Sequence, residues 1–324
     1  MSRIAVTGTG SFLGGRLLRR LAEHEPERIV AVDVSAPPPA LGVGYRPLDL
    51  TEPASDEALL HVFREERVDT LVHFAFLTNP RRDTSFAHEL ESIGTLSLMA
   101  AAAAAGLKRV VMRSFTAVYG ARGQNPNFLT EARPLQPNAA LSWVRDKLEA
   151  EQHAASFARR YPELSVTVLR FAPLFGPELR TFYTRVFDKR LVPMLMGFDP
   201  LVQLLHPDDA LEAALRALER DVRGAVNIVP RAPIPLGALL HLAEKVPLPV
   251  PHPLAYAACE ALWAAGVTEA PGGFLDYVRY QFVADGAHAE RELGFRARYS
   301  SRDALMAYLR YRHPDSASLR EATV

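Results

Sequence analysis

The 324-residue sequence contains a single cysteine, Cys259, which excludes an internal disulfide. A lone cysteine fits a protein of the reducing cytoplasm, where we expect it to be a small core residue. The sequence also lacks a net charge, because Lys+Arg and Asp+Glu both number 37. Without an excess of positive charge, nothing draws the chain to nucleic acid or to an anionic membrane surface.

Long apolar runs are absent as well. The stretch 98–107 (LMAAAAAAGL) falls well short of the roughly 20 residues that a membrane-spanning helix needs. A strand-like segment, RIAVT, already begins at residue 3 and leaves no room for a signal peptide. With 48% hydrophobic and 23% charged residues, the composition is that of a globular protein. We therefore expect a cytoplasmic protein with neither membrane nor nucleic acid as partner.

What the sequence does contain is an alternation of strand and helix patterns. Short apolar runs alternate with segments whose apolar residues recur at helical spacing. Strands are expected at 3–7, 28–33, 68–76 and 108–115 and within 164–177, and helices at 12–24, 56–67, 84–105 and about 143–160. This alternation predicts an α/β fold built on a doubly wound parallel sheet, the Rossmann architecture.

A glycine-rich turn lies between the first strand and the first helix. In VTGTGSFLGG (6–15), the glycines allow a tight turn, a close approach to a pyrophosphate and helix N-terminal amides that face its charge. Asp33 ends the second strand, 19 residues after Gly14, where a carboxylate can accept both hydroxyls of an adenosine ribose and would repel a 2′-phosphate. The sequence therefore predicts NAD rather than NADP as cofactor. The alternative for Asp33 is a solvated aspartate at a strand end.

The predicted cofactor-binding residues follow from this unit. Those expected at the adenosine and pyrophosphate are Gly8, Gly10, Ser11, Phe12, Leu13, Gly14 and Asp33. Asp49 and Leu50 follow a third strand, where the carboxylate could meet the adenine or could instead shape a turn. Phe74 and Ala75 would line the path of the cofactor across the sheet.

After about residue 172 the alternation loosens, and Pro-rich segments such as VPRAPIPLG and KVPLPVPHPLAY appear. The segment 224–229 (GAVNIV) reads as one more strand of the main sheet, so the two parts are expected to interleave. We predict an NAD(P)-binding Rossmann domain of residues 1–171 plus about 207–230. Residues 172–206 and 231–324 are expected to form a smaller, interleaved C-terminal substrate-side region.

These motifs, in this order, resemble the extended short-chain dehydrogenase/reductase family, the NAD-dependent epimerases and dehydratases of nucleotide sugars. VTGTGSFLGG is similar to the family's T-G-x-x-G-F-L-G turn, VDTLVHFAFLTNP to its D-x-V-x-H-x-A strand and RSFTAVYG to its S-S-x-A-V-Y-G strand. VLRFAPLFGP, LLHPDDALEAAL and AERELGFRARYS match its later landmarks. The resemblance covers almost the whole chain, extends to bacterial nucleoside-diphosphate-sugar epimerase-like proteins, and implies a nucleotide-sugar-like small-molecule substrate.

The sequence departs from the family where acid–base chemistry takes place. In the family's Y-x-x-x-K pair, the lysine lowers the pKa of the tyrosine and binds the nicotinamide ribose, while the tyrosine transfers a proton. Here the pair reads Trp143 and Lys147, and the family's Ser/Thr position falls on Phe115. An indole does not titrate in a useful range, and losing acid–base catalysis typically costs about 10²–10⁴-fold in rate. Ser11 also replaces the family's middle glycine, so that its Cβ would crowd the pyrophosphate.

Few other residues are candidates for the missing chemistry. Tyr119 is a weak catalytic candidate whose alternative is a structural tyrosine at a strand end. Arg113 is either an anion ligand or, more simply, extends out at the end of the sheet. His206, Asp208 and Asp209 superficially suggest a metal cluster, but their spacing fits a helix N-terminus. The sequence has neither a G-x-S-x-G elbow nor a Cys–His metal pattern, so we predict no metal site.

Two functions remain. The first is an NAD-dependent oxidoreductase or epimerase with altered acid–base machinery, in which Lys147 holds the nicotinamide ribose. The second is a non-catalytic NAD(H)-binding sensor or assembly subunit, and a scaffold that binds nothing is a third alternative. The resemblance also implies a homodimer formed by helices 84–105 and 143–160, although a monomer could bury the same apolar faces.

Overall fold

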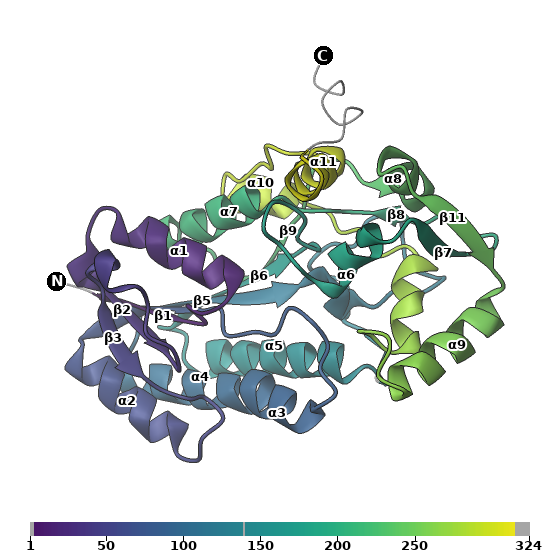
Figure 1. Cartoon of the computed structure of the whole chain (residues 1–324). Coiled ribbons are helices and arrows are strands. Elements are labelled where there is room, and N and C mark those ends of the chain that lie inside the picture. The colour runs from purple at the N-terminus through teal and green to yellow at the C-terminus, as the bar shows by residue number, and fades with distance from the viewer. Residues whose placement is uncertain (1–2, 139, 315–324) are drawn as a thin grey trace.

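The structure, a computed structural model, describes residues 3–138 and 140–314. Its centre is a seven-stranded sheet in the order β3-β2-β1-β4-β5-β6-β9 (Figure 1), in which each neighbouring pair of strands is parallel. The strands are β1 (Arg3–Thr7), β2 (Ile29–Asp33), β3 (Gly44–Pro47), β4 (Val68–His73), β5 (Arg109–Phe115), β6 (Ser165–Phe171) and β9 (Gly224–Ile228). The predicted doubly wound sheet is confirmed, and its strand order reverses between β1 and β4, where folds of this kind bind their ligands.

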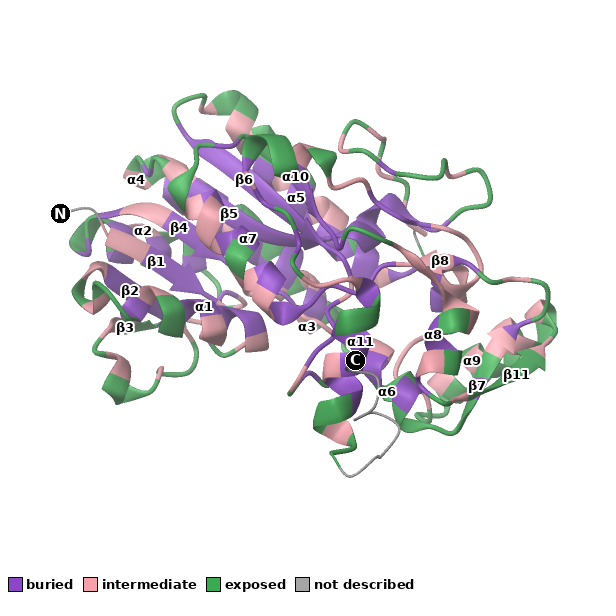
Figure 2. Cartoon of the chain, turned by 90° about the horizontal axis from the view of Figure 1, so that it is seen from above, coloured by how far each residue is buried: buried purple, intermediate pink, exposed green. Residues whose placement is uncertain are grey.

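Helices cover both faces of this sheet (Figure 1). One face carries α1 (Phe12–Ala22) and α7 (Pro207–Glu219), which contact each other, and the other carries α2 (Ser55–Glu65), α4 (Gly94–Ala105) and α5 (Ser142–Arg160). Because both faces are covered, the central strands are apolar runs without alternation, and all seven residues of β6 are buried (Figure 2).

The predicted helix 84–105 is not one continuous α-helix. It consists of α3 (Thr84–His88), a π-helical turn at Glu89–Ile93, and α4, which ends at Gly106 with φ of 72°. A π-turn inserts one residue into the helix, and such turns are frequent at functional sites. Here the turn buries Glu91, an acidic residue that a regular helical pattern would assign to solvent.

The C-terminal part of the chain lies at the carboxyl edge of the sheet (Figure 1). It contains two small sheets, one with β7 (Leu191–Leu195) parallel to β11 (Val246–Val250), the other with β8 (Leu201–Val202) antiparallel to β10 (Ile234–Pro235). Its helices are α6 (Phe182–Arg185), α8 (Leu236–Leu242), α9 (His252–Ala264), α10 (Ala287–Glu292) and α11 (Ser301–Arg312). Single 3-10 turns occur at Pro26–Arg28, Pro39–Leu41, Thr116–Tyr119 and Val186–Asp188, and a longer one at Gly272–Val278.

β9 pairs with β6, which confirms the prediction that residues 224–229 form one more strand of the main sheet. The exact division into two regions stays a prediction. The expectation for Cys259 was wrong: the residue lies on α9, which has no buried residue, and is only half-buried.

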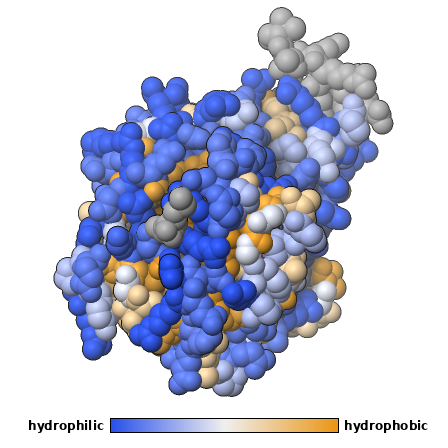
Figure 3. Space-filling model, turned by 90° about the vertical axis from the view of Figure 1, so that its left-hand side faces the viewer, coloured by the Kyte–Doolittle hydropathy of each residue, from blue (hydrophilic) through white to orange (hydrophobic). Residues whose placement is uncertain are grey.

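The surface on the side of the N-terminal strands is largely hydrophilic, with apolar residues in small separate patches (Figure 3). Among the described residues, no helix is both long enough and apolar enough to cross a membrane.

His73, at the end of β4, is fully buried between two hydroxyl groups. Its Nδ1 lies 2.8 Å from Thr7 Oγ1 and its Nε2 lies 3.0 Å from Thr95 Oγ1. Burial lowers the pKa of His73 from 6.5 to about 3, so the imidazole stays neutral in the folded protein while it protonates in the unfolded chain. Stability is therefore expected to fall as the pH drops from 6.5 towards 3, by about 1.4 kcal/mol per pH unit from this residue.

Urea unfolding of the native protein and of His73→Gln at pH 6.5 and pH 5 measures this contribution. The native protein should lose about 2 kcal/mol more than the variant over that interval. An equal loss in both proteins would assign the acid sensitivity to other groups.

Candidate functional site

The glycine turn after β1 is fixed by close backbone packing. A Cβ on Gly8, where φ is 74°, would lie 2.3 Å from the carbonyl carbon of Phe74, and one on Gly14 would lie 2.1 Å from Gly8 O. Gly10 differs, because the nearest atom to its Cβ would be Asp33 Oδ1 at 3.9 Å. The fold therefore requires glycine at positions 8 and 14, whereas Gly10 leaves open space in front of the turn.

Asp33 is held against this turn at the end of β2. Its Oδ2 accepts hydrogen bonds from Gly10 N at 3.1 Å and Thr9 Oγ1 at 3.2 Å, and its Oδ1 accepts one from Val34 N at 2.8 Å. These bonds place a carboxylate beside the turn, where the sequence predicts the adenosine ribose.

Ser11 is the N-cap of α1. Its hydroxyl donates to Gly8 O at 2.7 Å and accepts from Gly14 N at 3.1 Å, so the Oγ atom is bonded within the turn. Leu13 is buried and Phe12 half-buried in the first helical turn, which contains no acidic residue. The first turn itself therefore adds no negative charge that would oppose an anion at this helix end.

Asp49 and Leu50, the predicted adenine contacts, have structural neighbours. Asp49 Oδ1 accepts hydrogen bonds from Thr51 N at 2.9 Å and Thr51 Oγ1 at 2.7 Å, which is the arrangement of a turn-forming aspartate. Leu50 is buried beside Gly94, at the start of α4. Their roles at the cofactor stay predictions.

Phe74 and Ala75 follow β4 next to the glycine turn. The Phe74 ring is fully buried and packs edge-on against Phe171 at 6.2 Å. Only the backbone of Phe74 is therefore placed to line a cofactor path, whereas Ala75 is half-buried.

Trp143, which the sequence predicts in place of the family's tyrosine, stands near the start of α5. Its indole Nε1 donates to Leu77 O at 3.1 Å, and its ring packs against Phe115 at 5.3 Å, Phe274 at 5.6 Å and Phe182 at 6.0 Å. We call Phe115, Trp143, Phe182 and Phe274 the aromatic cluster. It joins the main sheet to the C-terminal region and has no titratable group.

Phe115 faces this cluster, and its neighbours do not take its place. Ser114 points to the other side of β5 and donates to Glu151. Thr116 begins the 3-10 turn after β5 and is buried. The Ser114 hydroxyl is therefore engaged away from the cluster, and the replacement of the family's Ser/Thr by Phe115 stays a prediction.

Lys147 forms a buried ion pair with Glu91 of the π-turn. Its Nζ lies 2.8 Å from each Glu91 carboxylate oxygen, and neither side chain has exposed surface. The ammonium also lies 4.0 Å from the centre of the Trp143 ring and 5.0 Å from that of Phe115. Glu91 accepts a further hydrogen bond from Leu77 N at 2.6 Å.

This pairing changes what Lys147 can do. Burial lowers the pKa of Lys147 to about 8 and raises the pKa of Glu91, while the mutual attraction of the pair opposes both shifts. An ammonium has three N–H donors, and the geometry directs it at both Glu91 oxygens. Its role at the nicotinamide ribose stays a prediction.

Tyr119, the weak catalytic candidate, belongs to a buried polar network. Its hydroxyl donates to Asn227 Oδ1 at 2.8 Å and accepts from Arg170 Nη1 at 2.8 Å, and Arg170 in turn is paired with Glu151. Burial raises the pKa of Tyr119. These contacts favour the structural interpretation of this tyrosine.

Arg113 does not extend out of the sheet, so that prediction was wrong. The residue is buried, its Nη2 donates to Thr78 Oγ1 at 3.3 Å, and its guanidinium lies 4.7 Å from the centre of the Phe115 ring. Burial lowers its pKa to about 10. Its Nε has no hydrogen-bond partner among the described residues, which leaves one donor free near the cluster.

His206, Asp208 and Asp209 form the start of α7, as their spacing predicts. His206 is the N-cap and its Nδ1 accepts from Asp208 N, while Asp208 pairs with Arg16 at 2.6 Å. Asp209 accepts hydrogen bonds from the backbone amides of residues 298 and 299. All three side chains are therefore used by the fold.

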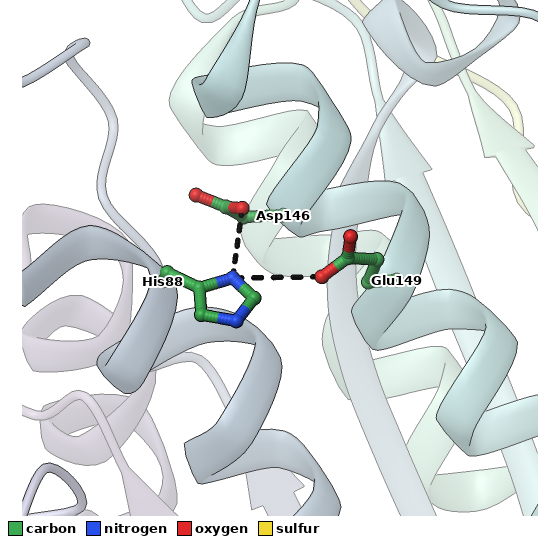
Figure 4. A group of neighbouring side chains, drawn as sticks. All are labelled: His88, Asp146 and Glu149. Carbon is green, nitrogen blue, oxygen red and sulfur yellow. Dashed lines mark hydrogen bonds and ion pairs between the residues drawn. The ribbon is translucent and has the colours of Figure 1, made fainter. Parts of the chain in front are cut away.

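A different group, which the sequence did not reveal, meets on the helices of the opposite face (Figure 4). His88 Nδ1 lies 3.1 Å from Asp146 Oδ1 and 3.5 Å from Glu149 Oε2. Arg145 lies within 4 Å of both carboxylates, and Ser92 donates to Glu149. With a cation already beside both acids, this group is an ion-pair network between α3 and α5.

Sequence reasoning missed Glu91, Phe182 and Phe274. Glu91 lies 56 residues from Lys147 and was read as part of an ordinary helix. The two phenylalanines come from the C-terminal region, where no motif marks them. Their only sequence signal is the frequency of aromatic residues between 171 and 187 and between 274 and 282.

Comparisons with known proteins agree with this geometry. The model of the NAD-dependent epimerase/dehydratase family matches residues 4–229. An uncharacterized protein of Mycobacterium tuberculosis is 32% identical over 318 residues, which is 95% of this chain and 84% of that protein. The 3-diazoavenalumate denitrifying reductase of a Streptomyces species is 31% identical over 214 residues, 61% of this chain and 67% of that protein. The structure of MoeE5 in complex with UDP-glucuronic acid and NAD superposes with a TM-score of 0.74 at 22% identity, covering 97% of this chain and all of that one.

Proposed function

Since the chain belongs to the NAD-dependent epimerase/dehydratase family, we propose that it binds NAD(H) at the glycine turn and acts as an oxidoreductase on a small-molecule substrate. NAD is the cofactor of this family, and when bound it supplies or accepts a hydride. The observation that carries the proposal is the Asp33 carboxylate, which Gly10 N and Thr9 Oγ1 hold beside the turn. The open space in front of Gly10 supports it as well.

We propose a net oxidation or reduction rather than an epimerisation. An epimerase must remove a proton and a hydride and return the hydride within one active site, which requires a group that gives and takes the proton. Trp143 cannot serve, because its indole N–H donates to Leu77 O and does not titrate. A reduction needs only one proton per turnover, and water can provide it. The Streptomyces relative is a reductase by name, and a reductase catalyses the same class of reaction as the one proposed for this chain.

A second candidate is a non-catalytic NAD(H)-binding sensor or assembly subunit. The observation that favours it is the Lys147–Glu91 pair, which is buried beneath Trp143 and Phe115. A lysine that is neutralised by a neighbour can stabilise the fold without taking part in hydride transfer.

Calorimetric titration with NAD, NADH, NADP and NADPH tests cofactor binding. Native protein should bind NAD or NADH more tightly than the phosphorylated forms, because Asp33 would repel a 2′-phosphate. Asp33→Ala should weaken NAD binding by about 10- to 100-fold, since hydrogen bonds to a charged group contribute about 1.5–3 kcal/mol. Asp56→Ala, an exposed acid on α2, is the matched control and should leave the affinity unchanged. Equal affinities in the Asp33 variant and the native protein would refute the assignment of Asp33.

Transfer of deuterium from NADH labelled at its reactive carbon separates the two candidates. An oxidoreductase should deliver the label to a member of a panel of ketones, aldehydes and UDP-sugars, and Asp33→Ala should abolish the transfer at low cofactor concentration. Cofactor binding without transfer to any member of that panel would favour the sensor.

A further inference from the structure

A cavity lies against the aromatic cluster, whose Phe115 and Trp143 rings contact Lys147. It is lined by residues 173–187 together with later segments of the C-terminal part, and its space, which includes open solvent, amounts to about 920 Å³. Phe182 and Phe274 line it and also pack against Trp143. The cavity therefore shares a wall with the position at which the family's proton donor would stand.

The lining of this cavity is apolar. Leu, Val, Phe, Pro and Ala side chains dominate it, and none of the described residues that line it is Arg, Lys, His, Asp or Glu. Two of its polar side chains are satisfied within the protein. The Gln203 amide exchanges two hydrogen bonds with the backbone of Ala284, and the Tyr277 hydroxyl donates to Ala117 O at 2.7 Å.

The Tyr183 hydroxyl is the exception. Tyr183 lines the cavity with its ring 3.9 Å from that of Phe182, and its buried hydroxyl has no hydrogen-bond partner among the described residues. A buried hydroxyl without a partner costs about 1–3 kcal/mol, which a ligand oxygen in the cavity would recover. Burial also raises the pKa of Tyr183, so that the hydroxyl keeps its proton and acts as a donor.

We propose that this cavity binds an apolar small molecule whose single carbonyl or hydroxyl oxygen accepts a hydrogen bond from Tyr183. The identification of this molecule as the substrate rests on the proposed oxidoreductase function. An apolar ketone or alcohol fits the lining, because it buries hydrocarbon against leucine and phenylalanine and has one polar atom to satisfy.

A nucleotide sugar does not fit this cavity. Its diphosphate carries two negative charges, and burying unpaired charges in an apolar site is strongly unfavourable. A neighbouring polar pocket shares Tyr277 with the cavity and is lined by Arg122 and Asp276. A nucleotide would have to bind in that pocket instead, so a nucleotide sugar is the competing outcome of the test.

Fluorescence titration with Prodan, an apolar naphthyl ketone, tests the proposal on the full chain. Native protein should bind it saturably and shift its emission to the blue. Tyr183→Phe keeps the ring and removes the donor, and should weaken binding about 5- to 10-fold, as expected for one hydrogen bond. Val186→Trp should weaken it more than 10-fold, because Val186 lines the cavity at a partly exposed position where a larger side chain fills the space.

Leu254→Trp is the matched control for Val186→Trp. Leu254 is exposed on α9 and does not line the cavity, so the added indole should not change Prodan binding. Thermal unfolding checks that all three variants are folded. Absence of saturable binding to the native protein, or equal affinities in the two tryptophan variants, would overturn the proposal. The proposal would also be overturned if Prodan did not bind and the affinity for UDP-glucose fell in Val186→Trp. That result would show that the cavity binds a nucleotide sugar.

Calorimetry with NAD on the same proteins keeps the two proposals apart. NAD binding without Prodan binding refutes the apolar cavity and leaves the oxidoreductase. Prodan binding without NAD binding refutes the oxidoreductase and leaves the cavity as a binding site.

Discussion

Replacing Glu91 by leucine is expected to lower the free energy of unfolding by about 3–5 kcal/mol, because it leaves the fully buried Lys147 ammonium without its counter-ion. The single change Lys147→Met should cost a similar amount, since it leaves the Glu91 carboxylate unpaired. The double variant Glu91→Leu/Lys147→Met removes both charges and should recover most of the loss, because buried ion pairs are often replaced by apolar residues at little cost. Chemical unfolding of the four proteins measures these differences.

Arg145→Ala provides the control. Arg145 is about half-exposed and lies 3.6 Å from the buried Asp146 carboxylate and 3.9 Å from that of Glu149. His88 remains beside Asp146 when Arg145 is removed, so the change should cost less than about 1 kcal/mol. A loss in Glu91→Leu as small as that in Arg145→Ala would mean that water reaches Lys147. A double variant as unstable as the sum of the single ones would show that the two charges do not act as a pair.

Gly10→Ala is expected to abolish measurable NAD binding, with a loss of at least about 100-fold, while the protein remains as stable as the native one. The added methyl group meets no protein atom closer than 3.9 Å, so the fold has room for it. It would occupy the space through which the backbone approaches a pyrophosphate. Calorimetry with NAD, together with thermal unfolding, measures both effects.

Gly14→Ala is the companion variant, in which NAD binding and stability should both fall. Its Cβ would lie 2.1 Å from Gly8 O, so the turn itself must shift and stability should fall along with affinity. Unchanged NAD binding in a folded Gly10→Ala protein would place the cofactor elsewhere, or show that the chain binds none.

The sheet and the glycine turn could be predicted because their determinants are local. β1, β2 and the start of α1 follow from apolar runs, glycines and a helix cap within 33 residues of sequence. β9 could be assigned to the same sheet because its apolar pattern resembles that of the earlier strands. The replacement at Trp143 could be seen because it lies at a fixed spacing from Lys147.

The partner of Lys147 could not be predicted, because no local sequence pattern indicates that Glu91 is buried beside it. Glu91 stands in a helical segment, where an acid normally faces solvent, but here it is buried within the π-turn at Glu89–Ile93. The predictions for Arg113 and Cys259 were wrong for a similar reason. The burial of Arg113 depends on its contacts with Thr78 and Phe115, and the half-burial of Cys259 depends on how α9 packs, and no short-range pattern encodes either.

The position of Trp143 also makes it an optical reporter. The sequence has only two tryptophans, and the second, Trp263, lies on α9 under the Arg82 guanidinium. A protein with Trp263→Phe would keep a single indole, at the wall between the predicted nicotinamide site and the apolar cavity. Emission from that one side chain would then register occupancy on either side of the wall, without any attached label.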